Sequence, residues 1–312
     1  MEAELELLLE RVTALHGAAY EDEIGLRQED RSLVQRALAA ELVYRPAPRF
    51  LAVPGTDPRI VKCRQFRAHL TCASAAEVLG YPMWSKPDSL HLAVPNNRGV
   101  RSSPHRDLSA VVVHRRTRLT PMTVDDFPLV VPAEVVACCL KCLDELDAIC
   151  VADAALHRGD TTKEEVAELL TGRYSARARQ RLERAEPATR SPLETRTRLA
   201  LRDINLSVDT GVIVEGVGEV DMLVEGWLIV ETDGWEFHSS NEQYALDRHR
   251  DQAALAQGFV PIRLTGQDVA AGEERIRRIV AQAILGAARS DRVTVPKNPG
   301  IMRNLCRAAG AH

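Results

Sequence analysis

The stretch that decides the fold runs from Gly218 to Asp251 and reads GEVDMLVEGWLIVETDGWEFHSSNEQYALDRHRD. Two apolar runs, residues 220–224 and 228–232, flank a short segment with a glycine, which predicts two strands joined by a tight turn. A segment with a histidine follows, and then a stretch that predicts a helix over residues 242–257, ending at Gly258. Acidic side chains accompany both strands, and they are more numerous than a sheet face exposed to water requires.

The apolar residues of the two runs predict the register of this hairpin. Side chains alternate along a strand, so a slip of one residue would move every side chain to the opposite face. Apolar residues face each other only if Val224 pairs with Leu228 and Met222 pairs with Val230. The turn is then three residues long, and Gly226 supplies the positive φ that such a turn needs.

This register brings carboxylates together at one end of the hairpin. Asp221 stands opposite Glu231, and Glu219 and Asp233 lie on the same side, one pleat away. Unpaired acids repel one another, and a hard divalent cation removes that repulsion. The pattern therefore predicts a Mg²⁺ or Mn²⁺ site, where the cation can activate water and neutralise charge on a phosphate. The alternative is an edge hairpin whose acids only meet water.

The segments around the hairpin complete a small α/β domain over residues 190–286. A helix is predicted from Ser191 to about Arg202, and a strand near residues 208–217 leads into the hairpin. A strand at residues 260–264 and a helix at residues 273–285 follow the helix after the hairpin. The predicted order is α-β-β-β-α-β-α, and residues 287–312 are expected to form a loose tail.

The motifs of this domain resemble the PD-(D/E)xK nuclease superfamily, most closely its very-short-patch-repair-like endonucleases. The matching residues are Glu194, Asp221, Glu231, Asp233, His238, the D-R-H-R-D sequence at 247–251 and the strand from Gly258 to Arg263. The resemblance implies a restriction-endonuclease-like α-β-β-β-α-β core that cuts DNA with a divalent metal. It implies Asp221 and Glu231 as metal ligands and Glu194 as a supporting acid.

One departure from that superfamily concerns its motif lysine. Asp233 stands in the place of the lysine, and residues 190–285 contain no lysine at all. The task of orienting water or stabilising the transition state would pass to His238, Arg248 or Arg250, or to a second metal held by Asp233, or be lost.

Each of these residues also has a simpler explanation. Glu194 fits a capping box with Ser191, and Asp233 precedes a glycine in a common turn pair. His238 could be a turn histidine, and residues 247–251 could be a solvent-exposed helix face with intrahelical ion pairs.

Residues 1–60 have the outline of a winged helix-turn-helix domain. The predicted elements are three helices and two extended runs, at residues 4–15, 20–26, 30–40, 42–44 and 50–53. The third helix would present Arg31, Gln35 and Arg36 to DNA, and the wing would add Arg45 and Arg49. The segment holds 11 acidic and 7 basic residues, so a packing or dimerisation module is the alternative.

Residues 61–189 predict a mixed α/β middle domain. A helix is expected at residues 69–79, strands at residues 90–94 and 110–114, and two helices within residues 132–156. A further helix is expected to begin with a capping box near Thr162. Arginine-rich stretches that include Arg115 and Arg116 are candidates for contacts to backbone phosphates. Solvated loops and helix faces are the alternative.

Composition limits the classes of protein to which the chain can belong. Its 312 residues predict two or three domains, and a net charge of −4 confines any nucleic-acid contact to local patches. The chain lacks a signal peptide and a transmembrane run, which predicts a cytoplasmic protein without a membrane partner. Cys139 and Cys142 form a C-x-x-C sequence without a second pair. We interpret them as apolar filler of a helix, with metal binding or redox chemistry as alternatives.

Two functions follow as hypotheses. The first is a Mg²⁺-dependent DNA endonuclease whose N-terminal domain contacts DNA or a partner. The second is a non-catalytic, DNA-binding regulator on a degenerate nuclease fold. It is favoured by the absent lysine and by the acidic balance of the chain. The N-terminal two thirds also resembles AbiEi-type antitoxin proteins, which implies a partner protein of a toxin–antitoxin or defence system. A protein-interaction module is a third alternative.

Overall fold

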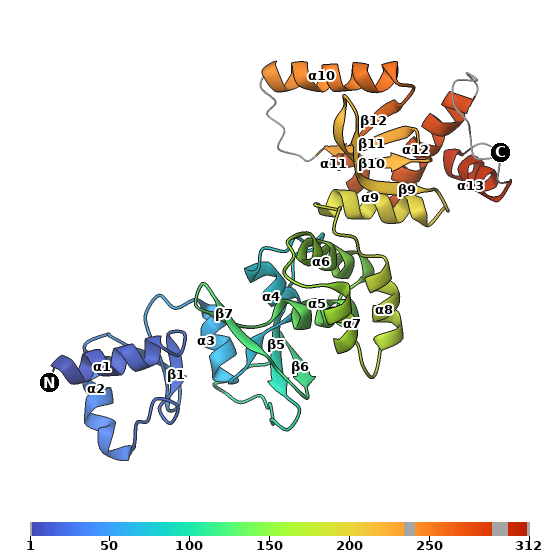
Figure 1. Ribbon diagram of the computed structural model, residues 1–312. Coiled ribbons are helices and arrows are strands. Elements are labelled where there is room, and N and C mark those ends of the chain that lie inside the picture. The colour runs from blue at the N-terminus through green and yellow to red at the C-terminus, as the bar shows by residue number, and fades with distance from the viewer. Residues whose placement is uncertain (1, 234–240, 289–298, 311–312) are drawn as a thin grey trace. The chain divides into compact units, whose positions relative to one another are not determined.

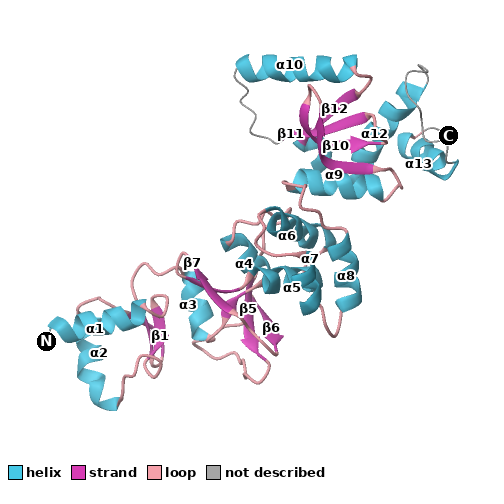
Figure 2. Ribbon diagram, in the orientation of Figure 1, coloured by secondary structure: helices cyan, strands magenta, loops and turns pink. Residues whose placement is uncertain are grey.

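The protein mixes helices and sheets in two compact units (Figure 1). The computed structural model describes residues 2–233, 241–288 and 299–310. Unit 1 comprises residues 1–151 and 160–182, and unit 2 comprises residues 152–159 and 183–312. Both units contain helices as well as strands (Figure 2), which confirms the predicted α+β class. None of the described helices has the length and apolarity needed to cross a membrane.

The first part of unit 1 is a three-stranded sheet with two helices. Its elements are α1 (Glu2–Thr13), β1 (Ala18–Tyr20), η1 (Gln28–Asp30), α2 (Arg31–Ala39), β2 (Tyr44–Ala47) and β3 (Phe50–Ala52). The strand order is β1-β3-β2. The helix predicted at residues 20–26 is wrong. Ala18 pairs with Ala52 in the sheet, both alanines are fully buried, and the chain then turns through Gly25 at φ 74°.

The rest of unit 1 is built on a five-stranded sheet of order β6-β5-β4-β8-β7. The elements are α3 (Pro58–Gln65), β4 (His69–Leu70), α4 (Cys72–Val78), β5 (Leu90–Pro95), β6 (Val111–Arg116), β7 (Pro121–Val124), β8 (Phe127–Val130), α5 (Pro132–Cys142), α6 (Glu145–His157), α7 (Lys163–Leu169) and α8 (Ser175–Glu183). The strands predicted at 90–94 and 110–114 and the helices within 132–156 are confirmed. The capping box before α7 is also confirmed, on Thr162.

Unit 2 carries a four-stranded sheet of order β12-β11-β10-β9. Its elements are α9 (Pro192–Arg202), β9 (Val208–Val214), β10 (Gly218–Val224), β11 (Leu228–Asp233), α10 (Asn241–Ala256), β12 (Val260–Thr265), α11 (Gly266–Ala270), α12 (Glu273–Ala288) and α13 (Pro299–Ala309). β11 is antiparallel to β10 and parallel to β12. The predicted order α-β-β-β-α-β is confirmed, and α9 and α10 lie on opposite sides of the sheet (Figure 1).

The predicted register of the hairpin is confirmed. Val224 pairs with Leu228 and Met222 pairs with Val230, which leaves the turn at residues 225–227. Gly226 has φ 76°, and Glu225 before it also adopts a positive φ of 52°. All four paired apolar residues are fully buried, which is the physical reason for this register.

The loose tail predicted at residues 287–312 is wrong where the structure describes it. α12 extends to Ala288, and α13 packs against α12 as an amphipathic helix. Leu305 is fully buried, and the Asn304 side chain donates a hydrogen bond of 3.3 Å to the carbonyl of Ile204. Asn298 directly before Pro299 is a helix start signal, and the prediction of a loose tail did not take it into account.

Candidate active site

Three predicted acids continue one face of the hairpin. Leu223 and Ile229 are paired across β10 and β11, and side chains alternate along each strand. Asp221, Glu231 and Asp233 therefore lie on the same face as these two residues. This is the face toward α10, because Ile229 packs against Ala254 of that helix. All three acids are half-buried.

Asp221 and Glu231 contact each other's strands. The Oδ2 atom of Asp221 accepts hydrogen bonds from the backbone N–H of Thr232 at 2.8 Å and from its hydroxyl at 3.0 Å. In the other direction, a Glu231 carboxylate oxygen lies 3.4 Å from the backbone nitrogen of Asp221. These contacts hold the Asp221 carboxylate in one orientation beside Glu231.

Glu231 has an unfavourable electrostatic environment. Burial, and after it the negative charge of Asp221, together raise the pKa of its carboxyl to about 7, although Arg250 opposes both effects. One Arg250 nitrogen lies 3.4 Å from the Glu231 carboxylate, at the limit of a direct contact. Near neutral pH the Glu231 carboxyl is therefore only partly ionised.

The pKa values of Asp233 and Glu194 are raised in the same way as that of Glu231. Burial raises the pKa of Asp233; Arg263 opposes this effect and Asp221 adds to it. Burial also raises the pKa of Glu194, and Asp221 again contributes. Asp221 thus raises the pKa of Glu194, Glu231 and Asp233, which places these three around one common charge. Glu219, the other acid predicted at the hairpin, instead accepts a hydrogen bond from Arg190, which lowers its pKa.

Glu194 also makes the contacts of a helix cap. The Ser191 hydroxyl accepts the backbone N–H of Glu194 at 3.2 Å, and the Glu194 carboxylate accepts the backbone N–H of Arg190 at 2.9 Å. The capping explanation is thus correct for the first of these bonds. The second bond goes to Arg190 instead of Ser191, so it is not a complete capping box.

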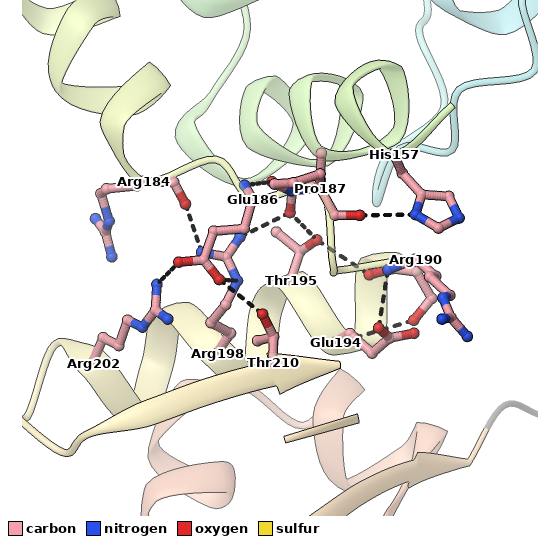
Figure 3. A network of polar contacts seen from close by, with 12 residues as sticks. His157, Arg184, Glu186, Pro187, Arg190, Glu194, Thr195, Arg198, Arg202 and Thr210 are labelled. Carbon is pink, nitrogen blue, oxygen red and sulfur yellow. Dashed lines mark hydrogen bonds and ion pairs between the residues drawn. The ribbon is translucent and has the colours of Figure 1, made fainter. Parts of the chain in front are cut away.

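A buried ion pair anchors α9, the helix that carries Glu194. The side chains of Arg198 and Asp153 are 0% and 2% exposed, and their charged groups are 2.8 Å apart. Thr195 and the backbone of Glu186 also donate to Asp153, at 2.8 and 2.6 Å. Figure 3 shows how Arg198 reaches the carbonyl of Arg184, at 2.5 Å. The contacts fix the position of α9 in unit 2.

Arg250, one of the residues predicted to take over the task of the absent motif lysine, lies beside Glu231. Its guanidinium donates to the carbonyls of Val217 at 2.8 Å and Glu219 at 2.6 Å, and it faces Glu231. The neighbouring Asp251 binds Arg263 of β12 at 2.9 Å. These contacts run between helix and strands, so residues 250 and 251 are not a purely solvent-exposed face. His238 lies outside the described residues.

The donor set suits a hard cation. Carboxylate oxygens are the ligands that Mg²⁺ prefers, and a cation would offset both causes of the raised pKa values, burial first and repulsion by Asp221 second. The carboxylates are nevertheless not gathered as closely as a bound metal requires. Within the described parts of the chain, one group of His, Cys, Asp or Glu side chains meets that condition, and it lies in unit 1: Cys72, His91, His114 and Cys142. The sequence does not predict this group, although Cys142 belongs to the C-x-x-C sequence.

The predicted DNA-contacting residues of the N-terminal part converge in one groove. Arg31 and Gln35 of α2 and Arg45 of β2 line a groove of about 460 Å³, which Arg27 and Arg49 also line. Glu21 is part of the lining and binds Arg45 at 2.8 Å and Arg49 at 3.5 Å. We call this surface the α2 groove.

Arg36, by contrast, is not among the residues that line the α2 groove. Its guanidinium binds Glu4 of α1 at 2.8 Å. Arg115 and Arg116 line a separate cavity of about 740 Å³, together with Arg118 and Lys141. Acidic residues line it as well: Glu134, Asp160, Glu165 and Glu168. The two predicted sets of basic residues therefore belong to different surfaces of unit 1.

Comparisons with known proteins leave the family of the chain open. No known protein family and no curated protein matches it. Among solved structures it is similar to the crystal structure of RV2827C protein from Mycobacterium tuberculosis, at 18% identity and a TM-score of 0.37. That match covers 63% of this chain and 81% of the other. A likeness of this degree supports no conclusion about function.

Proposed function

We propose that the chain is a metal-dependent DNA endonuclease with its active site on the β10–β11 hairpin. The observation that carries the proposal is that Asp221, Glu231 and Asp233 lie half-buried on one face of the hairpin, where burial and the charge of Asp221 raise the pKa of the other two acids. Perturbed acids that repel one another are typical of functional sites, because structure alone gains nothing from the repulsion. Asp221, Glu231 and Asp233 would hold Mg²⁺ or Mn²⁺, which supplies an activated water and neutralises charge on the scissile phosphate.

The remaining residues of the site have assignable tasks in this proposal. Thr232 orients the Asp221 carboxylate through two hydrogen bonds. Arg250 supplies a permanent positive charge beside Glu231, where it can bind a phosphate oxygen in place of the absent lysine. Glu194, with its raised pKa, can hold a proton or a water molecule at the edge of the site.

A cleavage assay tests the proposal. Supercoiled plasmid and linear DNA are incubated with the full chain in Mg²⁺, Mn²⁺ or EDTA. We expect metal-dependent nicking or cutting that falls at least about a hundredfold in Asp221→Asn and in Glu231→Gln. Asp209→Asn, an exposed acid of the neighbouring strand β9, is the matched control and keeps full activity. Equal cutting by the wild type and Asp221→Asn, or no cutting with either metal, refutes the proposal.

A second candidate function is a DNA-binding regulator without catalysis. It is favoured by the α2 groove, because Arg27, Arg31, Arg45 and Arg49 line this one surface and would contact backbone phosphates there. Salt-dependent binding of the chain to its own promoter region, without metal-dependent cleavage, would support this function. The absence of binding at low salt would exclude it.

A further inference from the structure

Four potential metal ligands from four different elements meet in unit 1. Cys72 is the first residue of α4, His91 belongs to β5, His114 to β6, and Cys142 is the last residue of α5. One donor atom from each lies within 4.8 Å of the donor atoms of the other three. The residues are 19, 23 and 28 positions apart along the chain, so only the fold brings them together. We call this group the Cys2His2 cluster.

The β-sheet and the adjoining helices position the two histidines. β5 and β6 are parallel neighbours, and His114 pairs with Ala93, two residues from His91, so both imidazoles lie on one face of the sheet. The backbone N–H of His91 donates to the Ser74 hydroxyl of α4 at 2.8 Å. Its carbonyl accepts the backbone N–H of Thr71 at 3.1 Å. These bonds hold β5 against the end of α4 where Cys72 lies.

The distances suit a tetrahedral centre. His91 Nδ1 lies 3.1 Å from His114 Nε2, and the Cys142 sulfur lies 4.0 Å from His91 Nδ1. Bonds of about 2.0 Å to nitrogen and about 2.3 Å to sulfur place neighbouring tetrahedral ligand atoms roughly 3.3 to 3.8 Å apart. Small rotations of the side chains are therefore enough to reach that geometry from a largest separation of 4.8 Å.

We propose that the Cys2His2 cluster binds one zinc ion that stabilises unit 1. Two thiolates and two imidazoles are a ligand set that favours zinc, and they exclude Mg²⁺ and Ca²⁺, which require oxygen ligands. All four tetrahedral positions are filled by protein, which is the arrangement of structural and not of catalytic zinc sites. This site is independent of the acidic hairpin in unit 2 and of the proposed endonuclease activity.

Burial favours a ligated cluster over ordinary core packing. Cys72 and His91 are buried, His114 is half-buried, and Cys142 is exposed. Two ring nitrogens that face each other at 3.1 Å, with the Cys142 sulfur 4.0 Å from one of them, bring imidazole lone pairs and a thiol to one place, where a cation can bind them all. The exposed Cys142 gives the ion a path from solvent. A disulfide between Cys72 and Cys142 is the competing chemistry, and the experiment must separate the two.

The expected consequence of zinc is a cross-link between sheet and helices. The ion would join β5 and β6 to the first residue of α4 and the last residue of α5, elements that are far apart in sequence. Because binding requires the folded arrangement, its free energy adds to the stability of the unit. Removal of zinc should therefore lower the unfolding temperature of unit 1.

Metal analysis of the full chain tests this proposal. The chain is purified without a histidine tag under reducing conditions, and its metal content is measured by mass spectrometry. We expect about one zinc ion per chain, with two sulfur ligands at about 2.3 Å and two nitrogen ligands at about 2.0 Å in X-ray absorption. Cobalt substitution should give the intense visible bands of a tetrahedral thiolate site. Zinc-free protein that is folded and reduced, or a Cys72–Cys142 disulfide in peptide mapping, overturns the proposal.

Substitutions identify the ligands. Cys142→Ser and His114→Ala should reduce the zinc content at least about tenfold. Cys63→Ser is the matched control, because this buried thiol of the same unit donates to the carbonyl of Ala68 and is not a member of the cluster. If a ligand variant fails to fold, reversible removal and return of zinc in the wild type, followed by thermal unfolding, provides the same test. Zinc retention in the double variant Cys72→Ser/Cys142→Ser refutes the assignment.

Discussion

At the scale of single residues, Glu231 links the acidic site to the stability of the protein. Its carboxyl has a pKa of about 7 in the folded chain, against about 4.3 in an unfolded chain. The folded state therefore binds more protons between these two values. The stability contributed by the protonated group is complete below about pH 4 and is lost as the pH rises through 7.

Glu231→Gln should remove this pH dependence. Glutamine does not ionise, so the variant keeps the stability that the wild type loses when Glu231 ionises. The variant should therefore be more stable than the wild type at pH 8 by roughly 3 kcal/mol and similar to it at pH 4.5. Urea unfolding of both proteins from pH 4.5 to 8 measures the difference, and Asp209→Asn is the control. A difference that does not change with pH would show that Glu231 does not titrate in this way.

Mg²⁺ should restore to the wild type the stability that it loses at high pH when Glu231 ionises. A cation that binds the ionised acids stabilises the folded state, and it should do so more at pH 8 than at pH 5. Glu231→Gln should lose most of this effect. The measurement is a thermal unfolding series with and without Mg²⁺, and it does not depend on finding the correct nucleic-acid substrate.

At the scale of elements, helix α2 carries two arginines with different surroundings. Arg31 lines the α2 groove, whereas Arg36 on the same helix binds Glu4. Arg31→Ala and Arg45→Ala should each weaken DNA binding at every sequence and reduce the slope of log affinity against log salt by about one. Arg36→Ala is the matched control and should change neither. Equal effects at positions 31 and 36 would exclude the α2 groove as the contact surface.

The helix α9 depends on its buried ion pair. Asp153→Ala leaves the Arg198 guanidinium buried without its carboxylate, which should lower the free energy of unfolding by about 3–5 kcal/mol. Because two well-packed apolar residues can replace a buried pair, Asp153→Leu/Arg198→Met should recover much of this loss. Denaturant unfolding of the single and double variants measures the loss in the free energy of unfolding and its recovery. Additive losses in a double-mutant cycle would contradict the coupling between the two residues.

At the scale of the whole molecule, the sequence best predicted the features that depend on the alternation of apolar and polar side chains along a strand. The hairpin register follows from Val220, Met222 and Val224 against Leu228 and Val230, because one face must be buried. It places Asp221 beside Glu231 without further information. β1 was missed because three residues give no periodicity, and its pairing partner, β3, lies about thirty residues further on.

The Cys2His2 cluster could not be predicted for a different physical reason. Its four residues come from two strands and two helix ends, and no two of them stand at a recognisable ligand spacing from each other. The interpretation of Cys139 as apolar filler agrees with its complete burial, whereas Cys142, three residues later, is exposed and belongs to the cluster. A helix turns by about a hundred degrees per residue, so the two thiols of C-x-x-C need not serve the same purpose.

The division of α6 between the units has a consequence for the order in which the protein is made. Residues 152–159 belong to unit 2 but precede residues 160–182, which complete unit 1. On the ribosome, Asp153 is therefore synthesised before the last segment of unit 1, and it must await Arg198, 45 residues later. Neither unit corresponds to one uninterrupted stretch of gene, so neither could be gained, lost or exchanged by a single fusion at one boundary.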